Sequence, residues 1–152
     1  MLPALTQFSN NYVALTTLLT WVFSQAIKVV LGIVREKRFN FMWFVGTGGL
    51  PSAHAAAVTA LASSIGLYEG FDTPVFGLAT LFAVIVLFDA QGVRRASGKQ
   101  AQLLNRILDD IYWKKKIQED RLMELLGHTP VEIFAGMIIG VLMSLLFYRG
   151  SI

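Results

Sequence analysis

The sequence predicts an all-α protein, an integral membrane helical bundle of about four transmembrane spans with an amphipathic interfacial helix. Hydrophobic residues make up 55% of the 152 residues and charged residues only 15%, whereas a soluble chain carries about 25% charged residues. The mean hydropathy is +0.58. Four stretches contain no Asp, Glu, Lys or Arg: 1–27, 39–68, 73–88 and 133–148. We expect one membrane domain covering residues 1–152.

Each uncharged stretch predicts one span, because a helix needs about 20 mostly apolar residues to cross a bilayer. The spans are expected near 11–34, 51–69, 73–91 and 130–148. The second stretch begins with glycine-rich residues 46–49 and then Pro51, which predicts a loop or re-entrant segment followed by a helix. No Lys or Arg precedes the first apolar run. We therefore expect a retained span there and not a cleaved signal peptide.

The polar segment 92–129 separates the third and fourth spans. Its apolar residues recur at helical spacing, which predicts an amphipathic helix at the membrane surface. These residues are Leu103, Leu104, Ile107, Leu108 and Ile111. The basic run 114–116 predicts a solvated continuation of this segment or a contact with lipid headgroups.

The basic residues are distributed unequally between the two membrane faces. Four alternating spans place 35–50 and 92–129 on one side, and 12 of the 13 Lys and Arg residues lie on or next to that side. Cytoplasmic loops collect Lys and Arg, so we expect this face to be cytoplasmic. A nucleic-acid partner is not expected, because these charges do not form a basic face on a soluble domain. A homo-oligomer remains open.

Polar residues from all four spans are expected to meet at the same face. They are Lys28 and Arg35, Ser52 and His54, Asp89, Arg94 and Arg95, and His128 and Glu132. Ionisable groups in membrane segments are costly and usually face the bundle interior. Two histidines surrounded by cations suit attack on a phosphate ester. One imidazole acts as nucleophile, the other as general acid, and the cations balance the charge of the transition state.

Three of these positions, Ser52, His54 and Glu132, also have a simple structural explanation. Ser52 fits a helix cap, and His54 fits a hydrogen-bonded residue at the membrane interface. Residues 129–132 fit a capping box with proline at the first helical position. Glu132 also stands four residues after His128, a spacing that lets a carboxylate orient an imidazole. The sequence leaves both explanations open.

Other candidate residues have structural explanations too. Arg94 and Arg95 fit charges that set membrane orientation, and Asp89 fits an ion pair with one of them. Gly136 and Gly140 fit close helix packing. We expect no metal site and no cofactor, because the chain has no cysteine and its two histidines lack the spacing of a zinc motif.

Three strings make the sequence similar to a known family: GTGGLPSAHAAAV, DAQGVRRASGKQAQLLN and ELLGHTPVEIFAGMIIG. Together they resemble the divergent type-2 phosphatidate phosphatase family, which is related to acid phosphatases and vanadium-dependent haloperoxidases. The resemblance covers about residues 28–140. Lys28 and Arg35 have the spacing of the first superfamily motif. Residues 51–54 match Pro-Ser-Gly-His with alanine for glycine, and His128 with Glu132 matches the end of the third motif with Glu for Asp.

The resemblance implies a phosphoric ester hydrolase that acts on a lipid phosphomonoester or diphosphate without a metal. His128 would form a phosphohistidine, Glu132 would orient it, and His54 would protonate the leaving oxygen. The phosphate would be held by Lys28, Arg35, Ser52, the backbone of Gly49 and one of Arg94 or Arg95. The superfamily arginine lies six positions before the nucleophile, where this chain has Leu122, so the third motif is split.

Two other functions are compatible with the sequence. The split motif allows a catalytically inactive protein that binds phosphate or phospholipid. Lys28 and Asp89 near the membrane allow a small transporter component. Among substrates, phosphatidate, phosphatidylglycerol phosphate and polyprenyl phosphates fit the sequence equally well.

Overall fold

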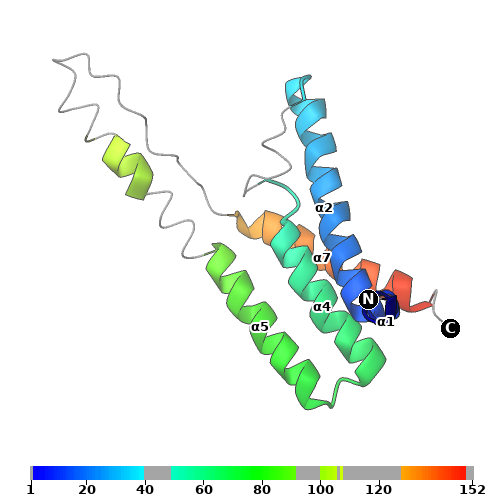
Figure 1. Cartoon of the computed structure of the whole chain (residues 1–152). Coiled ribbons are helices and arrows are strands. Elements are labelled where there is room, and N and C mark those ends of the chain that lie inside the picture. Colours follow the sequence, from blue (N-terminus) through cyan, green and yellow to red (C-terminus); the bar gives the residue numbers. More distant parts are fainter. Residues whose placement is uncertain (1, 40–48, 92–99, 106, 108–127, 150–152) are drawn as a thin grey trace.

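The computed structural model describes residues 2–39, 49–91, 100–105, 107 and 128–149. Every regular element in these ranges is a helix (Figure 1). The helices are α1 (Leu2–Ser9), α2 (Tyr12–Glu36), α4 (Ala53–Glu69), α5 (Pro74–Gln91) and α7 (Pro130–Arg149). Residues 100–105 are helical as well, within the segment where an amphipathic helix is expected. The all-α prediction is confirmed.

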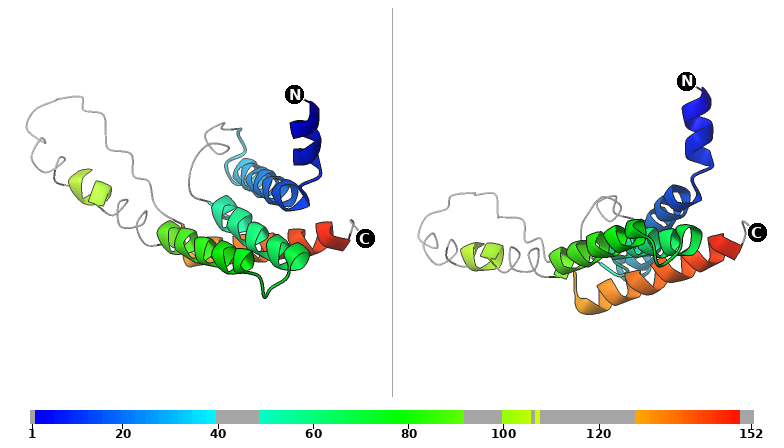
Figure 2. Two further views of the ribbon diagram at one scale, coloured as in Figure 1. Left: turned by 60° about the horizontal axis from the view of Figure 1, so that its bottom comes forward. Right: turned by 90° about the horizontal axis from the view of Figure 1, so that it is seen from below.

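Polar caps set the starts of the long helices. The Asn11 side chain accepts a hydrogen bond from the Ala14 N–H at 3.0 Å and begins α2. The Ser52 hydroxyl does the same for Ala55 at the start of α4, as short polar side chains do at this position. Helix α1 was not predicted from the sequence, and it stands at an angle to α2 (Figure 2).

Helix α4 is the centre of the bundle and packs against α2, α5 and α7. Helices α4 and α7 run in the same direction, because Gly136 lies against Ser52 and Ala56 while Gly140 lies against Ala56 and Ala60. Helices α2 and α5 run in the opposite direction (Figure 1). Consequently the starts of α4 and α7 and the end of α5 lie at one end of the bundle.

The interior is built from small and polar side chains, and the large apolar side chains point outward. Thr16, Thr20, Ser24, Ser52, Ser64 and Ser144 are fully buried, and most buried apolar residues are alanines. By contrast, Phe88 is 72% exposed, Val131 70% and Leu78 69%. This distribution is typical of helices that pack against each other within lipid, where no hydrophobic force drives large side chains inward.

The helices differ in whether they are long and apolar enough to cross a membrane. Among the described residues, Tyr12–Glu36 and Pro130–Tyr148 are long and apolar enough to cross a membrane, and Pro74–Ala90 is a shorter apolar helix. The sequence predicts about four spans. Of these, two described helices are long and apolar enough to cross a membrane by themselves.

Three tyrosines form a cluster at the end of the bundle opposite the starts of α4 and α7. Tyr12 at the start of α2 stacks on Tyr68 near the end of α4, with ring centroids 5.9 Å apart. Tyr68 also meets the edge of Tyr148, near the end of α7, at 5.2 Å. Tyrosine is enriched at membrane–water interfaces, so this cluster, far from the starts of α4 and α7, suits one bilayer surface.

The two glycines of α7 allow it to pack closely against α4. A Cβ atom on Gly140 would meet the Ala56 carbonyl oxygen, the Thr59 Cβ at 2.8 Å and the Ala60 nitrogen at 2.9 Å. One turn later, the Ser144 hydroxyl is 3.1 Å from the Ala60 carbonyl oxygen. The predicted role of Gly136 and Gly140 in helix packing is confirmed.

The replacement Gly140→Ala is expected to destabilise the protein by about 1–3 kcal/mol, because α7 must move away from the α4 backbone. The matched control is Gly77→Ala on α5, where an added Cβ would meet nothing within 4 Å. Alanine is the better helix former, so the control should be neutral or slightly stabilised. Thermal unfolding in detergent compares the two. Equal shifts in Tm would contradict the close packing of α7 on α4.

Candidate active site

The candidate site lies where α4 and α7 begin. The Ser52 N–H donates to the Glu132 carbonyl oxygen at 3.0 Å, so the two helix starts are joined directly. Ala55, Ala90 and Ile133 form one buried cluster, which brings the end of α5 to the same place. Two parallel helices thus direct their N-termini, with their partial positive charge, toward one region that favours anions.

The two histidines of the chain meet in this region. His54 is the second residue of α4, and His128 lies two residues before α7. Their ring centroids are 6.4 Å apart and the ring planes are inclined by 56°. His128 is only 3% exposed. Residues far apart in the sequence therefore supply a close pair of imidazoles, as the sequence analysis expects.

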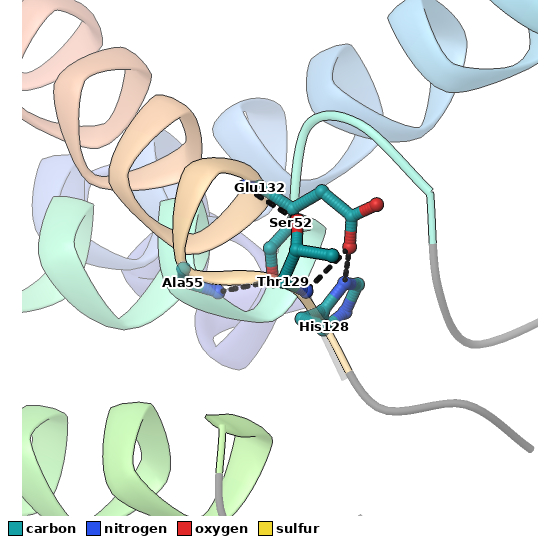
Figure 3. A network of polar contacts seen from close by, with 5 residues as sticks. All are labelled: Ser52, Ala55, His128, Thr129 and Glu132. Atoms are coloured by element: carbon teal, nitrogen blue, oxygen red, sulfur yellow. Dashed lines mark hydrogen bonds and ion pairs between the residues drawn. The ribbon is translucent and has the colours of Figure 1, made fainter. Parts of the chain in front are cut away.

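Glu132 performs both of the roles that the sequence leaves open. Its Oε2 atom lies 3.0 Å from Nδ1 of His128 and also accepts a hydrogen bond from the Thr129 N–H at 3.0 Å (Figure 3). In return, the Thr129 hydroxyl accepts from the Glu132 N–H at 3.3 Å, which completes a capping box. An ionised carboxylate can only accept a hydrogen bond, so this contact suits the tautomer in which Nδ1 of His128 carries the proton.

Lys28 reaches the site from α2. Its side chain runs along Gly49, whose φ is +90°, and a Cβ atom there would be 3.2 Å from the Lys28 Cδ. Lys28 is partly buried and close enough to Glu132 for their opposite charges to attract. Gly49 therefore has two reasons to be glycine, its left-handed backbone and the passage of the lysine side chain.

The structure places two of the expected phosphate ligands less favourably. The Ser52 hydroxyl is fully buried and engaged as the cap of α4, which favours the structural explanation for its side chain. Arg35 lies seven residues beyond Lys28 on α2, or about 10 Å along the helix axis, and is exposed.

The remaining predicted residues lie at or beyond the end of α5. Asp89 is partly buried in the last turn of α5, next to Ala90 of the cluster that joins the helix ends. Arg94 and Arg95 lie outside the described residues, as do 40–48 and the basic run 114–116.

Two buried polar residues of α2, Ser24 and Gln25, were not singled out from the sequence. Both are buried on α2, four and three residues before Lys28, and Ser24 Oγ and Gln25 Oε1 make no hydrogen bond with the described part of the chain. The available signal was their spacing from Lys28, which places them on the same helix face.

The fold and the site are those of a helical membrane protein with a pair of histidines at one end of the bundle. One of these histidines contacts a carboxylate. The chain belongs to the divergent PAP2 family, whose sequence profile matches residues 9–143. The chain is also 37% identical over 147 residues to a protein of Bacillus subtilis (strain 168) named "Uncharacterized membrane protein YuiD". The alignment covers 90% of this chain and 93% of that protein. No solved structure matches the chain. The family resemblance found in the three strings is confirmed.

Proposed function

We propose that this protein is a multi-pass membrane enzyme that removes phosphate from a lipid phosphomonoester or diphosphate through a phosphohistidine. The observation that carries the proposal is the pair His54 and His128, 6.4 Å apart between ring centroids, with Nδ1 of His128 held by Glu132. Membership of the divergent PAP2 family supports it.

The membrane setting rests on the helices. Besides α2 and α7, α4 has 17 residues and α5 has 18, so both are about 26 Å long, close to the ~30 Å hydrocarbon layer. The large apolar side chains of α5, such as Leu78, Leu81 and Phe88, point outward, whereas α4 packs against the other three helices. The related Bacillus subtilis protein is named a membrane protein. We place four spans in the bilayer with the histidine end at the cytoplasmic face, the side expected to collect Lys and Arg.

The proposed reaction has two steps. Nε2 of His128 attacks phosphorus, a P–N bond forms, and the P–O bond to the lipid breaks while His54 gives its proton to the leaving oxygen. Water then attacks the phosphohistidine, His54 takes a proton from that water, and phosphate leaves with the P–N bond broken. Lys28 and the N-termini of α4 and α7 stabilise the negative charge on the phosphoryl oxygens.

One observation favours the second candidate, a protein that binds lipid phosphates without turnover. His128 is only 3% exposed, and a nucleophile must meet its substrate directly. The two candidates predict different results when lipid phosphate is added to the purified protein.

The test is phosphate release by the protein in detergent–lipid micelles with a chelator present. We expect release from lipid phosphates, and a transient phosphate label on the protein that is stable to alkali and lost in acid. Binding of the lipids without release or label, by folded protein, would replace the hydrolase with the binding protein. Release that the chelator abolishes would overturn the metal-independent mechanism.

The replacement Gly49→Ala is expected to lower kcat/KM about tenfold, because a methyl group displaces the Lys28 side chain. A left-handed backbone conformation also disfavours alanine at this position. Kinetics of Lys28→Ala and of the double variant test the cause. If Gly49 acts through Lys28, the double variant loses no more than Lys28→Ala alone. Additive losses would show that Gly49 acts independently of the lysine.

A further inference from the structure

We propose that the hydrocarbon tail of the substrate lies along one side of α4, between α2 and α5, and that the lipid enters the site from the bilayer on this side. The inference rests on the proposed function and adds to it a tail-binding surface and a route of entry. We call this surface the open face of α4, and its residues are His54, Ala57, Leu61, Ile65 and Tyr68.

The open face is a single stripe along the helix. Its residues are spaced by three, four, four and three positions, which places them on one side of an α-helix. All five are partly exposed, whereas the residues at 55, 56, 58, 60, 62, 64 and 66 are buried. Between His54 at one end and Tyr68 at the other, every residue of the stripe is apolar.

The open face points away from α7. Thr59 lies against Gly140 of α7, and Ala57 and Leu61 each stand two positions from Thr59, which is about 160° around the helix axis. Helices α2 and α5 both pack against α4 and lie on either side of it (Figure 1). In the described helices no Cα atom of α2 lies within 8 Å of one of α5. These two helices therefore do not close over the open face.

The open face connects the site to the membrane interior. His54 belongs to the histidine pair and is partly exposed, whereas His128 is buried. From His54 to Tyr68 the face extends about 21 Å along the helix axis, which is most of the ~30 Å hydrocarbon layer. A lipid with its phosphate at the histidines can therefore align its tail with α4 and stay in contact with the bilayer.

The open face acts by giving access, because it cannot attract the tail strongly. Within a bilayer the protein surface and the surrounding lipid are equally apolar, so no hydrophobic force holds the tail on α4. Ala57 lies about one turn from His54 and leaves room where the tail departs from the site. A bulky residue at this position is therefore expected to slow the reaction of lipids that have a long tail.

The replacement Ala57→Trp tests this expectation. We compare kcat/KM for a long-chain phosphatidate with kcat/KM for phenyl phosphate, a soluble ester without a tail. The ratio of the two should fall at least about tenfold, because the indole occupies the path of the tail. The matched control Ala26→Trp adds the same side chain at an exposed position of α2 and should keep the wild-type ratio. An unchanged ratio in Ala57→Trp, or an equal fall in both variants, would overturn the proposal.

Photolabelling tests the route in the wild-type protein and requires neither a variant nor turnover. The probe is a phosphatidate with a diazirine midway along one tail. We expect the label at Leu61 or Ile65, and we expect unlabelled phosphatidate, but not diacylglycerol, to compete for it. Label spread over the outer surfaces of α2, α5 and α7 without competition would show that the tail has no defined place, and would overturn the proposal.

A second copy of the chain is the other occupant that the experiments must exclude. The chain has no cysteine, so Leu61→Cys introduces a single thiol on the open face. We expect no disulfide-linked dimer when this variant is oxidised in micelles. Efficient formation of such a dimer would show that two copies cover each other's open face, and the tail would have to lie elsewhere.

The tail-binding surface and the proposed function fail in different ways. Phosphate release without competed label on α4 would remove the tail-binding surface and keep the hydrolase. Competed label on α4 without phosphate release from any lipid would remove the hydrolase and keep the surface, as part of a protein that binds lipid phosphates.

Discussion

The replacement His128→Ala is expected to lower phosphate release from lipid phosphates at least about a thousandfold, since it removes the nucleophile of the proposed reaction. The alkali-stable phosphate label on the protein should vanish with it. His128 lies before α7 and outside the helix, so the variant should keep its helices. Circular dichroism checks this. Full activity in purified, folded His128→Ala protein would refute the phosphohistidine mechanism.

A comparison with His54→Ala separates the roles of the two rings. A general acid matters most when the leaving oxygen is a poor leaving group. His54→Ala should therefore be slow with an alkyl phosphate lipid and recover much of its rate with an aryl phosphate. His128→Ala should stay inactive with both substrates, because a better leaving group does not replace a missing nucleophile. Recovery of both variants with the aryl phosphate would contradict the assignment of roles.

The ends of the helices are the part of the fold that the sequence predicts best, for physical reasons that are local. Proline and polar caps specify where a helix begins. Asn11 begins α2, Ser52 begins α4 and Pro130 is the first residue of α7. The short helix α1 was missed because it lies in the same uncharged stretch as α2, where hydropathy alone shows no boundary at Asn10.

The site was predictable in part because a membrane orders residues by depth. Charged and imidazole side chains at the ends of spans reach the same bundle end whenever spans alternate in direction. By this rule His54 and His128 are expected at the same end of the bundle, where their ring centroids lie 6.4 Å apart. Depth is known only coarsely from the sequence, and Arg35 lies on the same face of α2 as Lys28 but about 10 Å further along the axis. For this reason the sequence could not show that Arg35 is exposed while Lys28 lies against Gly49.

Ser52 and Glu132 show a further limit of sequence reasoning. A cap and a ligand call for the same residue types, so the pattern of residues 51–54 or 128–132 cannot decide between them. Geometry decides differently in the two cases. The Ser52 hydroxyl is buried and used by the Ala55 N–H, whereas one oxygen of Glu132 serves the cap and His128 together.

The double use of this oxygen gives a reason for glutamate where the superfamily motif has aspartate. Glu132 is the third residue of α7, and a capping box needs the length of Glu or Gln at this position to reach back to the cap N–H. Aspartate is one methylene shorter. It cannot keep its contact with the Thr129 N–H and still bond Nδ1 of His128, so the start of α7 and the orientation of the ring depend on one side-chain length.

Glu132→Asp and Glu132→Gln are therefore expected to fail in different ways. Asp should lose about 1 kcal/mol of stability with the cap, and roughly tenfold to a hundredfold in kcat as the ring loses its fixed orientation. Gln can keep the cap and its stability, but it is neutral and should lower kcat by about a hundredfold or more, because it does not stabilise the imidazolium. Thermal unfolding and kcat on one lipid phosphate separate the two variants. If Asp retained both stability and rate, the shared oxygen would have no functional consequence, and the cap and the histidine pair would be independent.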